Sequence, residues 1–241
     1  NILSHIVEFR NGESGLHVLH IQTITEMLLR QLVQKENNRY ALSKEQIRMI
    51  TTASALHDIG KISIPDEILN KPGRLTAEEF AVIKGHSMAG ANMLSELPLD
   101  QKEEPLVKTA YEICRWHHER YDGGGYPDGL KGEEIPVSAQ VVALADVYDA
   151  LTSERCYKDA YSHEKAIEMI LAGQCGAFNP LMLECLLDIS SSLKKKMGYK
   201  SKERYEQTDL SDIASRFHDF EMDSSEKIVQ QLEFERMRHN F

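Results

Sequence analysis

Residues 114–136 read CRWHHERYDGGGYPDGLKGEEIP, and this stretch decides how the whole chain is interpreted. It begins with two adjacent histidines, His117 and His118, which end an apolar run typical of a helix. A glycine-rich loop follows from Asp122 to Pro127, where neither a regular helix nor a strand would continue. Neighbours on a helix point about 100° apart, so adjacent imidazoles suit two metals, or a metal and a substrate, better than one metal. A pair of surface histidines at a helix end is the alternative explanation.

Composition describes a globular protein of 241 residues, with 41% hydrophobic and 27% charged residues. No apolar run approaches the roughly 20 residues of a membrane helix, and no signal peptide opens the sequence. The four cysteines show no CxxC pair or framework spacing, so we expect reduced thiols in a cytoplasmic protein. The net charge of −10 argues against bulk nucleic-acid binding. A phosphate substrate would need local positive charge, which bound metal dications supply.

Helical periodicity dominates the sequence, and no convincing alternating strand pattern is present. Capping-box patterns at Ser43–Gln46 and Thr76–Glu79 start two of the expected helices. Gly60 is a plausible stop for the first of them. We therefore expect an all-α fold, with a short helix between 65 and 71 and longer ones over about 15–35, 43–56, 76–86, 88–97, 106–116, 137–151, 163–172 and 179–196.

Two motifs carry side chains that could bind a metal ion. His57-Asp58 places an imidazole beside a carboxylate, with Lys61 one turn later, and one aspartate can bridge two metals. A hydrogen-bonded surface pair is the alternative. Asp146 lies among Val, Ala and Leu residues, where a bare carboxylate would be costly to bury. It must therefore be paired or bound to a metal, and a structural salt bridge is its alternative role.

Three more residues could join the same pocket. His86 lies near a helix end, where a histidine is usually satisfied within a loop or core. Glu13 and His17 are four residues apart and would share one helix face, although Gly15 leaves open whether Glu13 lies in the helix. Alternatively, Glu13 favours the positive helix N-terminus and His17 packs in the core.

At this point the motifs resemble a known family. His57-Asp58 with Lys61 resembles the signature of the HD superfamily of metal-dependent phosphohydrolases. His117-His118-Glu119, followed by residues 122–127 and by GLKGEEIP at 129–136, resembles the HD-GYP subfamily. The resemblance covers about residues 6–187, and the spacing of several separated motifs agrees. It implies an all-α HD-domain helical bundle around a multinuclear metal centre.

The resemblance implies an activity and a set of site residues. HD-GYP proteins hydrolyse cyclic dinucleotides, chiefly cyclic di-GMP, at a two- or three-metal centre that usually contains iron or manganese. The expected product is the linear dinucleotide, with further cleavage to the mononucleotide left open. The implied ligands are His57, Asp58, His86, His117, His118 and Asp146, with Glu13 and His17 added in members that hold three metals. An N/O site without thiolates favours iron or manganese over zinc.

Other residues gain roles from the same resemblance. Lys61 matches the active-site lysine, while Arg155 and Lys158 match basic residues that hold substrate phosphates. In the implied mechanism Asp58 bridges two metals, and the three basic residues neutralise charge on the phosphoryl oxygens. Tyr126, in the Gly-Tyr-Pro loop, is expected at the substrate and near a signalling-protein partner. A solvated helix end is the alternative for Arg155 and Lys158.

The sequence departs from the family pattern at three places. His20 stands where Arg is common, Cys156 replaces Pro in an Arg-Pro-Tyr segment, and residues 178–180 replace a usual His-Phe-Asp-Pro. None removes a ligand. Two rival functions remain: a phosphohydrolase of another nucleotide, and a catalytically silent signalling module that binds a cyclic dinucleotide or a partner. A homodimer in bacterial second-messenger signalling is a further expectation.

Composition changes near Met197, after which residues are polar and charged. We therefore divide the chain into a phosphohydrolase domain at 1–196 and a polar helical appendage or linker at 197–241. The absence of an initial methionine suggests a piece of a longer protein.

Overall fold

A computed structural model describes residue 7 and residues 16–153 and 160–198. These residues form nine α-helices and three 3-10 helices, with no β-strand among them. The predicted all-α class is confirmed. The α-helices are α2 (Leu16–Leu32), α3 (Lys44–Ala53), α4 (Asp66–Leu69), α5 (Ala77–Ser95), α6 (Leu99–Lys102), α7 (Pro105–Trp116), α8 (Val137–Thr152), α9 (His163–Leu171) and α10 (Pro180–Lys196). The 3-10 helices are η1 (Ser54–Leu56), η2 (Ile59–Ser63) and η3 (Gly132–Glu134).

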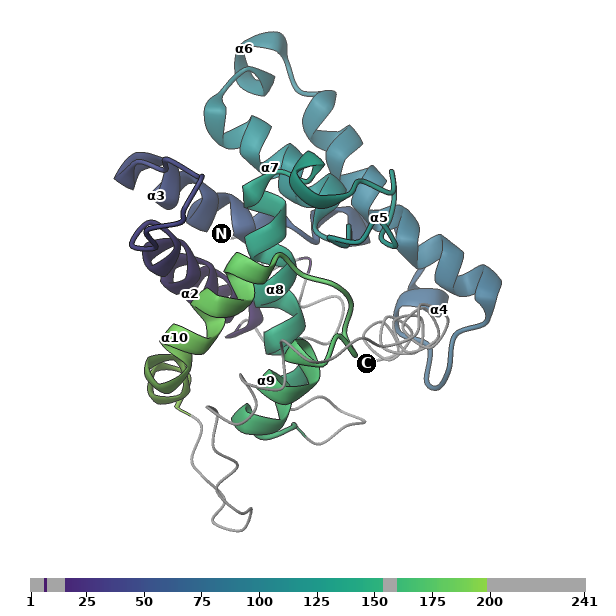
Figure 1. Ribbon diagram of the computed structural model, residues 1–241. Helices are drawn as coiled ribbons and strands as arrows, with labels where there is room; N and C mark the ends of the chain where they lie inside the picture. Colours follow the sequence, from purple (N-terminus) through teal and green to yellow (C-terminus); the bar gives the residue numbers. More distant parts are fainter. Residues whose placement is uncertain (1–6, 8–15, 154–159, 199–241) are drawn as a thin grey trace.

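Helix α8 lies at the centre of the bundle (Figure 1). It packs against α2, α7 and α9, while α10 packs on α2 and α9. Every residue from Ser138 to Thr152 is buried, so this part of α8 has no solvent face. Any carboxylate on α8 is therefore held in the interior.

Two helix starts follow the capping boxes that the sequence predicts. Ser43 Oγ accepts the Gln46 N–H at 3.2 Å, and the Gln46 side chain accepts the Ser43 N–H at 2.8 Å. Thr76 and Glu79 make the same reciprocal pair at 3.2 and 2.7 Å. Each box satisfies two backbone donors that a helix N-terminus leaves without intrahelical partners. Both predictions are confirmed.

The predicted break between His86 and Met88 is wrong, because α5 runs unbroken from Ala77 to Ser95. Gly85 weakens a helix by only roughly 1 kcal/mol relative to Ala. Packing of α5 against α7 and η2 outweighs that local preference. Tertiary contacts therefore join two predicted helices into one.

The sequence predicts that Gly60 ends a helix, and this prediction is wrong. Gly60 lies inside η2, where η2 crosses α5. A Cβ at Gly60 would come 1.9 Å from the His86 carbonyl oxygen and 2.4 Å from the Gly90 nitrogen. Only glycine permits this approach. The chain leaves α3 at Ala53, and Asp58 lies between η1 and η2. The crossing thus brings Asp58 beside His86.

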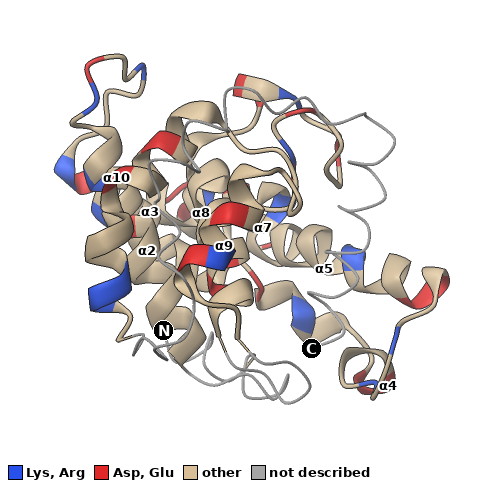
Figure 2. Ribbon diagram, turned by 60° about the horizontal axis from the view of Figure 1, so that its bottom comes forward, with Lys and Arg blue, Asp and Glu red and all other residues tan. Residues whose placement is uncertain are grey.

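The surface carries charges of both signs. Figure 2 shows Lys and Arg scattered among acidic residues over the described ribbon, consistent with the net charge of −10. Among the described residues, no helix is long and apolar enough to cross a membrane. The predicted appendage lies outside the described residues except for Met197 and Gly198, so the domain boundary stays a prediction.

Candidate metal centre

Four buried side chains form what we call the first cluster: Asp58, His86, His117 and His118. Each offers one ligand atom, and these atoms lie within 4.8 Å of one another. His86 Nε2 lies 3.1 Å from His118 Nε2 and 3.5 Å from His117 Nε2. His86 comes from the middle of α5, while His117 and His118 follow the last turn of α7. The packing of α5 on α7 therefore assembles the cluster.

Three further buried side chains form the second cluster: His17, His57 and Asp146. His17 Nε2 lies 3.4 Å from His57 Nε2 and 3.9 Å from Asp146 Oδ1. His17 begins α2 and Asp146 lies in central α8, while His57 follows η1. Contacts of α2 with both α8 and η1 bring these distant segments together.

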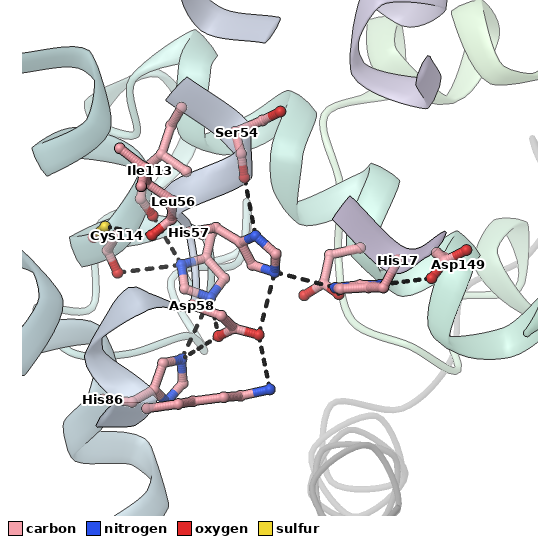
Figure 3. Close-up of polar contacts among 12 residues, drawn as sticks. His17, Ser54, Leu56, His57, Asp58, His86, Ile113, Cys114 and Asp149 are labelled. Atoms are coloured by element: carbon pink, nitrogen blue, oxygen red, sulfur yellow. Dashed lines mark hydrogen bonds and ion pairs between the residues drawn. The ribbon is translucent and has the colours of Figure 1, made fainter. Parts of the chain in front are cut away.

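Asp58 links the two clusters, and its carboxylate lies between His57 and His86 (Figure 3). Its Oδ1 is 3.1 Å from His86 Nε2, and its Oδ2 is 3.2 Å from His57 Nε2. Lys61 Nζ lies 2.8 Å from Oδ2. Burial opposes ionisation, yet the Lys61 ammonium helps to hold the pKa of Asp58 well below its ordinary 3.8. Asp58 is therefore an anion that faces both clusters.

Backbone carbonyls decide which ring nitrogen of three histidines carries the proton. A carbonyl oxygen only accepts hydrogen bonds, so the facing Nδ1 must be the donor. These contacts join His57 Nδ1 to the Ser54 oxygen at 3.0 Å, His86 Nδ1 to Ile83 at 2.7 Å, and His117 Nδ1 to Ile113 at 2.8 Å. In the neutral imidazoles the Nε2 atoms, which point into the clusters, then carry lone pairs.

The Nε2 atoms of His57 and His86 lie close to the Asp58 carboxylate, and that of His117 lies 3.5 Å from His86 Nε2. Asp58 Oδ1 is buried and accepts no hydrogen bond from a described residue, although His86 Nε2 lies 3.1 Å away. Acceptors packed this closely in the interior repel one another unless a cation lies among them. Imidazole nitrogens and carboxylate oxygens are the donors that divalent transition metals bind. The arrangement is consistent with a multinuclear divalent metal centre.

The glycine-rich loop lies against the first cluster. The Tyr126 ring stacks on the His118 ring, with centroids 4.6 Å apart and planes 15° apart, and the Tyr126 N–H donates to the His118 carbonyl oxygen at 3.3 Å. Lys84 Nζ lies 4.9 Å from the Tyr126 ring centroid, a cation–π distance. As predicted, residues 122–127 form no helix or strand.

A family model described as HD domain matches residues 7–178 of this chain. The match spans both clusters and the glycine-rich loop. The chain belongs to the HD domain family. The predicted family is confirmed, and in this HD domain the His57-Asp58 pair stands where the two clusters meet.

Curated relatives cover the HD domain and extend well beyond it. A "Probable cyclic di-GMP phosphodiesterase" of Vibrio cholerae is 42% identical over 191 residues, covering 77% of this chain and 42% of the relative. A "3'3'-cGAMP-specific phosphodiesterase 2" of the same organism is 39% identical over 186 residues, covering 77% of this chain and 33% of the relative. The chain thus spans less than half the length of these relatives.

A solved structure shares the HD fold. Bd1817, an HDG"Y"P protein from Bdellovibrio bacteriovorus, aligns with a TM-score of 0.54 at 21% sequence identity. The alignment covers 73% of this chain and 51% of that chain. The likeness supports the fold of the HD domain.

The HD domain brings together most of the predicted site residues. The six predicted core ligands and His17 occupy the two clusters. Lys61 contacts Asp58, and Tyr126 covers His118. The other predicted site residues, Glu13, Arg155 and Lys158, lie outside the described residues, as does Cys156.

Sequence reasoning missed Asp149, which supports the second cluster. Its Oδ2 accepts from His17 Nδ1 at 2.6 Å, and its Oδ1 accepts from His20 Nδ1 at 2.7 Å. Burial opposes ionisation, yet hydrogen bonds from both histidines hold the pKa of Asp149 well below its ordinary range. A carboxylate three residues after Asp146 on the same apolar helix was the available signal. Asp149 also explains why α2 directs both buried His17 and half-buried His20 toward α8.

Proposed function

We propose that this HD domain hydrolyses a cyclic dinucleotide, with cyclic di-GMP as the leading candidate, to the linear dinucleotide. The observation that carries the proposal is the convergence of imidazole lone pairs and the Asp58 carboxylate in two linked, buried clusters. Such a centre suits phosphodiester hydrolysis. The relatives named as cyclic di-GMP and 3'3'-cGAMP phosphodiesterases support this substrate class.

The residues present fit divalent metals. In our proposal, the residues of the first cluster would hold one ion and those of the second another, with the Asp58 carboxylate facing both. Bound metals would lower the pKa of a water molecule and offset charge on the phosphoryl oxygens. Iron or manganese is favoured, because the donors in both clusters are nitrogen and oxygen. The nearby Cys114 thiol instead donates to the Leu56 carbonyl oxygen at 3.0 Å.

The chain's own residues would supply orientation and charge. Asp58 stays ionised beside Lys61, as its lowered pKa indicates, and so remains a ligand near neutral pH. The Lys61 ammonium, 2.8 Å from Asp58, would lie where negative charge develops on the phosphoryl group. Arg155 and Lys158 are proposed for the same role on the basis of the sequence motif. The aromatic face of Tyr126 would border the substrate next to His118.

A third ion remains part of the proposal. The second cluster has three donors among the described residues, and Glu13 lies four positions before His17 in the sequence. A carboxylate at this place would add a ligand and favour a third cation beside a second substrate phosphate. Anomalous scattering at the iron or manganese edge would count the ions. Two peaks in a fully loaded crystal would reject the third site and leave the reaction unaffected.

Turnover by metal-loaded protein tests the reaction. The chain is reconstituted anaerobically with Fe(II) or with Mn(II), and cyclic di-GMP and 3'3'-cGAMP are assayed side by side by chromatography of the products. We expect linear dinucleotide from cyclic di-GMP and loss of turnover after chelation. Binding of a cyclic dinucleotide without turnover would instead indicate a silent signalling module. Faster hydrolysis of 3'3'-cGAMP would reassign the substrate within the same class.

Several sequence-based expectations stay predictions. They are a signalling partner at the glycine-rich loop, a homodimer, a cytoplasmic location, and an appendage that links this domain to others. Deletion of residues 197–241 tests the last of these. Metal content and activity should survive the deletion if the HD domain is complete without this segment.

A further inference from the structure

Glu119 is buried and organises the loop of residues 122–130, which comprises the glycine-rich loop and the three residues after it, although Glu119 belongs to neither cluster. Its carboxylate accepts three successive backbone N–H groups. Oε1 accepts from Asp128 at 2.7 Å and from Gly129 at 3.0 Å, while Oε2 accepts from Leu130 at 3.0 Å. Hydrogen bonds to a charged acceptor are stronger than neutral ones. The carboxylate is therefore an internal anchor around which the loop turns.

A second set of contacts ties the same loop to the end of α7. The Asp128 carboxylate accepts from Arg115 Nε and Nη2 at 2.7 and 3.0 Å and from Trp116 Nε1 at 2.7 Å. Gly125 lies directly on the chain that it faces, since a Cβ there would come 2.3 Å from the Arg120 nitrogen. The loop is thus held at Gly125 and at residues 128–130 onto residues 115–120, the segment that carries His117 and His118.

We infer that Glu119 is a positioning residue for the first cluster: by fixing the loop, it holds the Tyr126 ring against His118. The ring covers one face of the imidazole at 4.6 Å, and its backbone N–H binds the His118 carbonyl oxygen. Orientation of His118 would then depend on a loop that Glu119 holds in place.

The chemistry of the carboxylate makes a sharp substitution available. In Glu119→Gln the amide retains one acceptor oxygen, but its NH₂ group must face at least one of the three N–H donors. The volume hardly changes. The matched control is Glu134→Gln, because exposed Glu134 also accepts a backbone N–H, from Lys131 at 2.8 Å. Glu134 lies in the same stretch, residues 114–136, and contacts Lys131 rather than Tyr126 or His118.

The chain provides its own reporter of loop position. Its single tryptophan is Trp116, whose indole N–H binds Asp128 in the loop. Release of the loop should therefore raise the quenching of Trp116 fluorescence by acrylamide. This measurement needs neither metal nor substrate. Metal affinity is measured separately with Mn(II) alone, from the electron paramagnetic resonance signal of the free ion.

We expect Glu119→Gln to keep its helical circular dichroism, to increase Trp116 quenching, and to weaken Mn(II) binding roughly 10-fold or more, the usual effect of losing an outer-sphere partner. Glu134→Gln should match the wild type in all three. Unchanged Mn(II) affinity in folded Glu119→Gln would overturn the inference.

If Glu119→Gln fails to fold, Tyr126→Leu and Tyr126→Phe test the same inference. The leucine variant should weaken Mn(II) binding, and the phenylalanine variant should not. Equal, wild-type affinity in both would overturn it.

The inference rests on the proposed metal centre but not on the proposed reaction. Mn(II) binding without hydrolysis would reject the reaction and leave the role of Glu119 standing. Absence of Mn(II) binding by the wild-type chain would reject the metal centre, and this inference with it.

Discussion

The two clusters differ in what holds their histidines. In the first cluster, His86 and His117 donate to backbone carbonyls of α5 and α7, the helices from which they come. In the second cluster, His57 likewise donates to the Ser54 carbonyl oxygen, but His17 donates to the side chain of Asp149, which comes from α8. A helix provides its own carbonyls wherever it forms, whereas the Asp149 carboxylate reaches His17 only after α2 packs on α8.

We therefore expect the two proposed metal sites to differ in robustness. Apart from Asp58, which faces both, each cluster has three donors among the described residues. The second cluster, however, depends on segments separated by 132 positions, as the contact between His17 and Asp149 shows. We therefore expect tighter binding at the first cluster and an affinity at the second that a single side chain can change.

Replacing the carboxylate that faces both clusters should have the largest effect. In Asp58→Ala, turnover should fall by more than about 10³-fold, the upper range for loss of an electrostatic catalyst. Both metals should bind more weakly, because Asp58 Oδ1 faces His86 and Oδ2 faces His57. Elemental analysis with a turnover assay measures this, and Asp100→Ala, on α6 away from both clusters, is the control. Loss of only one metal would assign Asp58 to a single cluster.

Lys61 should affect chemistry and leave both clusters occupied. In Lys61→Met the aliphatic stem remains, but the ammonium 2.8 Å from Asp58 is lost. We expect kcat to fall roughly 10²–10³-fold with KM little changed, because the charge acts on the transition state. Metal content should equal that of the wild type. Lys108→Met removes a surface pair with Glu103 instead and serves as the control. A raised KM at constant kcat would make Lys61 a binding residue.

Asp149 tests the comparison directly, because its effect should be confined to the second cluster. In Asp149→Asn the amide can accept from one histidine but presents NH₂ to the other. Affinity for the more weakly bound metal should fall about 10–100-fold, with the tighter site unchanged. Stepwise Mn(II) titration resolves the two, with Asp188→Asn on α10 as an exposed control. Equal weakening at both sites would show that the clusters are not independently supported.

The opposite side of α8 should give the smallest effect. Tyr148 Oη and Ser190 Oγ each lie 2.7 Å from a ring nitrogen of buried His163. Burial, and secondarily Lys194, lowers the pKa of His163 below its ordinary 6.5, despite Glu164. The folded state therefore binds fewer protons than the unfolded state as pH falls below 6.5, and stability is lost on acidification.

His163→Gln should flatten that part of the pH dependence. One proton contributes at most about 1.4 kcal/mol per pH unit, so the change in slope between pH 6.5 and 5 is bounded. Urea unfolding of the metal-free chain at several pH values measures it, with His239→Gln as a control at a histidine far along the sequence. An unchanged slope would mean that His163 titrates alike in both states.

Local sequence determined where helices begin and which side chains can bind metal. The capping boxes at Ser43 and Thr76 involve residues three positions apart, so their outcome depends little on the rest of the chain. Likewise, Asp146 on an apolar helix needed a partner wherever that helix packed. These predictions rest on interactions within one turn or on the cost of burying one group.

Only the tertiary structure decided how those side chains are grouped. His57 joins His17 and Asp146, while its neighbour Asp58 joins His86, because the chain passes between η1 and η2 at this point. The close crossing of Gly60 over α5 also brings His86 to Asp58. Helix crossings depend on side-chain packing across the whole core. Periodicity along a single segment carries no information about them, and for the same reason it did not reveal the partners of Asp149 and Glu119.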